Sequence, residues 1–123
     1  MFRKHRYLFL LIIWIISVIF LSLVSFPKTK IRPLFSHSDK IVHFVFYFVM
    51  TLLLMRFFKI ETSWFKTFRL RAIVSFVIVF VLGVLIEFLQ EKITLYRSGD
   101  IKDIYFNTFG IIVAIYLLRM TRF

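Results

Sequence analysis

The stretch AIVSFVIVFVLGVLIEFL, residues 72–89, decides the fold of this chain of 123 residues. Only Ser75 and Glu87 carry polar side chains in it. A helix needs roughly 20 apolar residues to cross a bilayer core about 30 Å thick, so this segment is long enough to span a membrane. Apolar segments of similar character lie on both sides of it. We predict four transmembrane helices, at residues 7–26, 41–58, 72–90 and 101–118.

The composition excludes most other classes of protein. Hydrophobic residues make up 61% of the chain, against about 45–50% in an ordinary soluble domain. The 18 phenylalanines exclude disorder, and the absence of cysteine excludes disulfides and thiolate sites. The apolar segments do not alternate with polar residues as barrel strands do. We therefore predict an all-α integral membrane bundle of four helices, forming a single domain over residues 1–123.

The basic residues indicate the topology of this bundle. The net charge of +11 comes from short clusters of lysine and arginine between apolar segments. This pattern is typical of membrane proteins, so no nucleic-acid partner is expected. Ten of these residues lie at the termini and in the middle loop, and seven lie in the other two loops. The positive-inside rule then places both termini in the cytoplasm, with the middle loop against anionic lipid.

The first apolar segment is too long for a cleaved signal peptide.

Unusual polar residues gather at the extracytoplasmic end of the last three predicted helices. In the second helix and the fourth helix they recur at helical spacing, which puts each set on one face. The third helix carries a pair three residues apart, and two basic residues lie nearby. We predict a shared polar site composed of Asp39, Lys40, His43, Glu87, Gln90, Arg97, Asp100, Asp103 and Asn107.

Each of these residues also has a purely structural interpretation. Asp39 and Asp100 suit the N-caps of their helices, and a single histidine is more often packed than functional. Gly110 together with Ala114 predicts close helix packing and no chemistry. The structural interpretation is weaker for acids such as Glu87, because burying a charge inside a membrane is costly unless it is paired.

The order of these residues resembles that of the VanZ-like family of small bacterial membrane proteins. The resemblance covers the last three helices, about two thirds of the chain. The matching positions are Asp39-Lys40-x-x-His43-Phe44, Glu87-x-x-Gln90 and Arg97-x-x-Asp100-x-x-Asp103-x-x-x-Asn107-x-x-Gly110.

The resemblance implies a multi-pass protein of the bacterial cytoplasmic (inner) membrane that acts in the cell envelope. Its expected partners are membrane lipid, a lipid-linked cell-wall precursor or an envelope protein. The family takes its name from a protein associated with resistance to the glycopeptide teicoplanin, so a link to antibiotic resistance is a further implication.

Three functional hypotheses stay open. The first is a non-enzymatic protein whose polar site binds a lipid headgroup, a cell-wall precursor or a partner. The second is a hydrolase or transferase for a lipid-linked phosphate, with Glu87 or Asp103 as base, His43 as acid or base, and Lys40 and Arg97 holding the phosphate. The third is a proton-coupled carrier, which the absence of an inverted repeat disfavours. We rank them in this order, predict no cofactor and assign no metal ligand. The set His43, Asp39, Glu87 and Asp103 offers oxygen and nitrogen donors that suit a divalent metal, so metal binding stays open, as does enzymatic activity.

Overall fold

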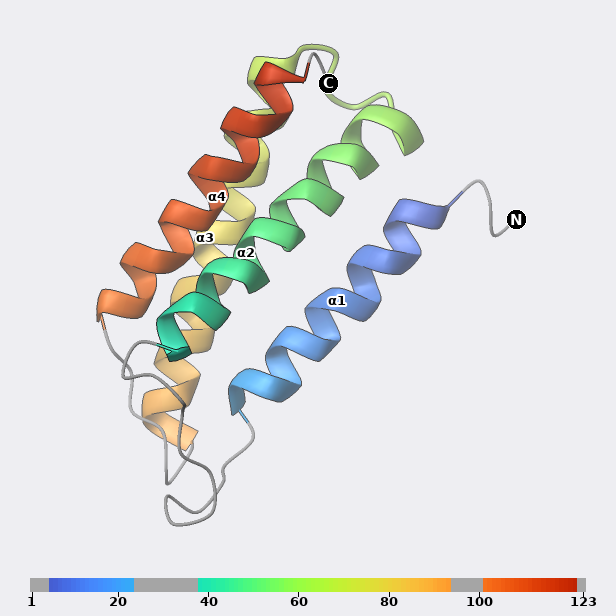
Figure 1. The fold of residues 1–123 in the computed structure, drawn as a ribbon. Helices are drawn as coiled ribbons and strands as arrows, with labels where there is room; N and C mark the ends of the chain where they lie inside the picture. Colours follow the sequence, from blue (N-terminus) through green and yellow to red (C-terminus); the bar gives the residue numbers. More distant parts are fainter. Residues whose placement is uncertain (1–4, 24–37, 94–100, 122–123) are drawn as a thin grey trace.

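The computed structural model describes residues 5–23, 38–93 and 101–121 of the chain. All regular elements in this part are helices, which confirms the all-α prediction (Figure 1). The helices are α1 (Arg6–Leu23), α2 (Ser38–Arg56), the short π-helix η1 (Phe57–Glu61), α3 (Phe68–Ile93) and α4 (Ile101–Met120).

The helix ends differ by a few residues from those predicted, for local reasons. α3 begins four residues earlier than predicted because Thr67 caps it. The Thr67 hydroxyl accepts the backbone N–H of Leu70 at 3.2 Å, and its carbonyl accepts that of Arg71 at 3.1 Å. α2 continues as one π-helical stretch to Glu61 and stops where Thr62 is extended. The predicted end of the first helix, residues 24–26, lies outside the described residues.

The four helices run alternately up and down, with α2 between α1 and α4 (Figure 1). α2 and α4 share the most extensive contact of any pair, while α1 packs on α2, α3 and η1. Hydrogen bonds connect α1 to α2 and to η1. The Trp14 indole N–H donates to the carbonyl of Phe46 at 2.9 Å. The Glu61 carboxylate accepts the backbone N–H groups of Tyr7 and Leu8, and thereby caps the N-terminus of α1 from another element.

Large apolar side chains cover the outside of the bundle. Ile16, Phe20, Phe88, Phe109 and Tyr116 are each more than half exposed, and many others are partly so. By length and composition, two segments are able to cross a membrane, Ile41–Glu61 and Phe68–Leu89. The apolar parts of α1 and α4, Arg6–Ser22 and Ile104–Met120, are shorter. The two long segments support a membrane-associated helical protein.

Gly110 is where α4 comes closest to α2. A Cβ atom built on Gly110 would lie 2.6 Å from the carbonyl oxygen of Phe44 and 3.2 Å from the backbone nitrogen of Phe48. Ala114, one turn further along α4, is fully buried. The pair expected to mediate close helix packing does lie within the bundle, and at Gly110 the obstacle is backbone that cannot rotate away.

Replacement of Gly110 by alanine is expected to destabilise the fold. The added methyl group must push α4 off α2, and overpacking of this kind costs about 1–3 kcal/mol. The free energy of unfolding, measured in mild detergent by titration with a denaturing detergent, checks this. Ile112→Leu, at a half-exposed position on the same helix, is the control and should change it little. Equal stability of the two variants would show that the helices separate there without cost.

Candidate functional site

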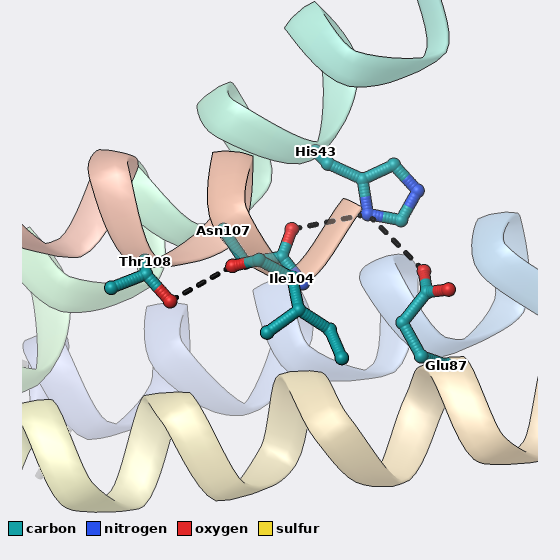
Figure 2. Close-up of polar contacts among 5 residues, drawn as sticks. All are labelled: His43, Glu87, Ile104, Asn107 and Thr108. Atoms are coloured by element: carbon teal, nitrogen blue, oxygen red, sulfur yellow. Dashed lines mark hydrogen bonds and ion pairs between the residues drawn. The ribbon is translucent and has the colours of Figure 1, made fainter. Parts of the chain in front are cut away.

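Three polar side chains from three helices meet inside one end of the bundle. His43 follows the start of α2 by five residues, Glu87 precedes the end of α3 by six, and Asn107 follows the start of α4 by six. At 1.5 Å per residue, each lies about 8–9 Å from its helix end. Because the helices alternate in direction, these equal depths place all three residues at one level, as Figure 2 shows.

One hydrogen bond and one ion-pair contact orient the imidazole of His43. Its Nδ1 lies 3.1 Å from Oδ1 of Asn107 and 3.9 Å from Oε1 of Glu87. An amide oxygen only accepts, so Nδ1–H donates to Asn107. The neutral ring then carries its lone pair on Nε2, which points away from Asn107 (Figure 2). When the ring is protonated, the Glu87 carboxylate provides the negative charge that pairs with it.

Two further residues shape the site. The ring of Tyr47 stacks on that of His43, with centroids 6.3 Å apart and planes inclined by 13°. A Cβ built on Gly83 would lie 3.0 Å from Nδ2 of Asn107 and 3.3 Å from Cε1 of Tyr47. Gly83 thus leaves room for both groups against α3. Its spacing of four residues from Glu87 on one helix face was the sequence signal for it, and Tyr47 shares a similar stripe with His43.

The cluster is almost completely withdrawn from solvent. His43 and Glu87 are each 4% exposed and Asn107 is 2% exposed, whereas the apolar residues on the outer face of the same helices are open. Nδ2 of Asn107 has no acceptor among the described residues. Thr108 does not join the cluster, because its hydroxyl donates to the carbonyl of Ile104 within α4 at 2.8 Å (Figure 2). A buried amide with an unused N–H indicates room for a further polar group, from water or a ligand.

The structure brings together three of the nine residues predicted for the site, His43, Glu87 and Asn107. Four others lie at the same end of α2, α3 and α4, but their side chains are outside the described part of the structure, and two lie wholly outside the described residues. The four are Asp39, Lys40, Gln90 and Asp103, and the two are Arg97 and Asp100. Their membership of the site therefore stays a prediction.

A metal is a further conceivable occupant of such a cluster. In the described ranges, no group of three or more His, Cys, Asp or Glu side chains is arranged to hold an ion. Of the four residues with suitable donors, His43 and Glu87 lie together, and the side chains of Asp39 and Asp103 lie outside the described part of the structure. The chemistry that the described atoms support is hydrogen bonding and proton exchange at an imidazole.

Comparison with known proteins gives one family. The family model described as VanZ/LLP1 matches residues 7–122, almost the whole chain, and bears out the resemblance seen in the sequence. No curated protein and no solved structure matches the chain.

The hydrogen bond to Asn107 is expected to hold His43 in the Nδ1–H tautomer. Solid-state ¹⁵N NMR of the protein in lipid checks this, in a background where His5 and His37 are replaced by Gln so that His43 is the only histidine. Asn107→Leu should shift the population toward the Nε2–H form that an unconstrained histidine side chain prefers, and Thr108→Val should not. An unchanged tautomer in Asn107→Leu would mean that Glu87 or another group orients the ring.

Proposed function

This chain belongs to the VanZ/LLP1 family, and on that premise we propose that it is a polytopic protein of the bacterial inner membrane that binds a polar ligand between α2, α3 and α4. The ligand is a lipid headgroup or a lipid-linked cell-wall precursor, and a polar segment of an envelope protein is the other candidate. The role in the cell envelope follows from the family resemblance together with the position of the cluster.

Two observations support four membrane spans. All four helices carry large exposed apolar side chains, including α1 and α4, whose apolar stretches are the shorter ones. In water such a surface would cause association, whereas a bilayer solvates it. The alternating directions of the helices also suit successive crossings (Figure 1). The excess of lysine and arginine at the end that carries both termini supports a cytoplasmic position for that end.

The burial of the cluster is the single observation that carries the binding proposal. A carboxylate in a membrane helix costs about 2.5–3.5 kcal/mol near the bilayer centre and less toward the ends. A bundle needs no such group for packing, since apolar residues of equal size pack without that cost. Polar side chains from three helices at one level therefore favour a ligand that uses them. Lys40 and Arg97, expected at the rim, would supply positive charge for a phosphate.

A second candidate is a hydrolase or transferase for a lipid-linked phosphate, and the orientation of His43 favours it. With Nδ1–H bonded to Asn107, Nε2 is the nitrogen that exchanges protons. It would take the proton of an attacking hydroxyl as the new P–O bond forms, and return it to the oxygen whose bond to phosphorus breaks. Glu87 would stabilise the imidazolium between the two steps. A contribution to teicoplanin resistance remains a hypothesis that the family resemblance alone suggests.

The proposed topology is testable with single cysteines, since the natural chain has none. Cysteines at Ser36 and Ser98 should react with a membrane-impermeant thiol reagent in intact cells, and one at Lys66 should react only after permeabilisation. The opposite pattern would place both termini outside the cytoplasm.

Loss of the Glu87 charge is expected to abolish ligand binding without unfolding the protein. Mass spectrometry of lipids that co-purify with the protein should show at least a tenfold drop of one polar lipid in Glu87→Gln, on the scale of a charged hydrogen bond of about 1.5–3 kcal/mol. Ser75→Ala is the matched control, because Ser75 is a buried polar residue on the same helix outside the cluster. Equal lipid content in all three proteins would contradict the binding proposal.

A second measurement distinguishes the binding protein from the enzyme. Purified protein is incubated with an isoprenyl phosphate and with an isoprenyl diphosphate, and released inorganic phosphate is measured. Release that disappears in His43→Gln while lipid binding persists would establish the enzyme, and binding without release would establish the binding protein.

A further inference from the structure

At the end of the bundle opposite the polar cluster, Arg71 is a buried cation. It lies in the first turn of α3 and is 9% exposed. Its guanidinium folds back toward the helix start, where Nη1 donates to the carbonyl of Phe65 at 3.1 Å. Its Nε has no acceptor among the described residues. One neutral carbonyl does not compensate a buried charge that has five N–H groups to satisfy, so this arrangement calls for an anion.

Among the described residues, no carboxylate supplies that anion. In the described part of this end of the bundle, Glu61 is the only acidic residue. Its two carboxylate oxygens are engaged by the backbone N–H groups of Tyr7 and Leu8, at the N-terminus of α1. The positive end of α1 thus takes the one described acidic side chain at this end, and among the described residues no carboxylate faces Arg71.

The surroundings of Arg71 suit a phosphate group at a membrane surface. The N-terminus of α3, a helix of 26 residues, adds the positive end of its dipole. Lys66 and Arg69 are exposed beside it, and Arg119 of α4 lies over the ring of Phe68, 5.3 Å from its centre. Trp64 is 68% exposed and packs edge-on against Phe57, as expected for an indole at a lipid interface.

We infer that the N-terminus of α3, with Arg71 at its centre, binds the phosphate of an anionic phospholipid. Arg71 provides the planar fork that matches a phosphate, the helix start adds its dipole, and the exposed side chain of Lys66 attracts the charge from solution. The sequence places all the basic residues of the middle loop near anionic lipid without distinguishing them. In the structure Arg71 differs from the others because it is buried. The inference requires that the chain lie in a membrane, but it is independent of the polar cluster and of the orientation of the bundle.

Quenching of Trp64 fluorescence by brominated lipid tests the site. The full chain, in a Trp14→Phe background, is reconstituted into vesicles that contain either brominated phosphatidylglycerol or brominated phosphatidylcholine. The unaltered site should prefer phosphatidylglycerol by about tenfold, as expected for charge-assisted hydrogen bonds to a phosphate that carries a net charge. Arg71→Gln should remove this preference, and Arg71→Lys should retain only part of it. Arg69→Gln, an exposed arginine two residues away, is the matched control and should retain most of it.

Each other outcome counts against the inference. An undiminished preference in Arg71→Gln would overturn it, as would equal losses in Arg69→Gln and Arg71→Gln, which indicate diffuse attraction to the surface. If Arg71→Gln does not fold, the Arg71→Lys variant provides the test. It keeps the charge but lacks the planar guanidinium, so an undiminished preference in this variant would also overturn the inference. The last measurement adds inorganic phosphate to the solution as a competitor. If it abolishes the preference while chloride at equal ionic strength does not, the site takes free phosphate and the lipid source is wrong.

Discussion

The approach of the α4 backbone to the α2 backbone at Gly110 is the contact on which the polar cluster depends. Gly110 lies three residues after Asn107, and its neighbour across the interface, Phe44, adjoins His43. The helix separation at this point therefore sets the distance between the amide and the imidazole one turn away, which is 3.1 Å. Gly83 plays the corresponding part on α3, where the missing side chain leaves space for the Asn107 amide and the Tyr47 ring.

The outside of the bundle is far more apolar than that of a water-soluble helical protein, and several polar side chains lie inside it. Phenylalanine, isoleucine and leucine side chains project from the outer faces of the helices, while Thr51, Ser75 and Asn107 are buried between them. In lipid this arrangement loses nothing at the surface, and polar groups gain by meeting one another inside. It also makes each buried polar group expensive unless it is satisfied. The hydroxyl of Thr51 is satisfied by donating to the carbonyl of Tyr47 at 2.7 Å, which removes it from any further chemistry.

The two ends of the bundle carry different electrostatic arrangements. One end has an imidazole, a carboxylate and an amide in contact, groups that exchange protons and pair with one another. The other end has a buried arginine and several exposed basic side chains, while its described acid, Glu61, is used to cap α1. This difference gives the protein a polarity along the bundle axis. It is also why the ligands proposed for the two ends differ, with a headgroup or precursor held among helices at one and a surface phosphate at the other.

The sequence by itself determined the helical class, the four apolar segments and the faces on which the polar residues lie. These properties follow from local composition and from a period of 3.6 residues, which needs no knowledge of neighbours. It also carried the family resemblance, because the order of the polar residues from Asp39 to Gly110 can be read along the chain without the fold.

Other features depended on the tertiary structure, because they are distances between helices. The sequence shows Trp14 only as an aromatic residue of the first apolar segment, whereas in the structure its indole N–H donates to the carbonyl of Phe46 in α2. It gave no role to Gly83, and it counted Glu61 and Arg71 only as charges. Of the other predicted site residues, Asp39, Lys40, Gln90 and Asp103 lie on helices at the same end of the bundle, while Arg97 and Asp100 lie outside the described residues. Periodicity specifies the direction in which a side chain leaves its helix, but the separation and rotation of each helix against its neighbours decide what that side chain meets.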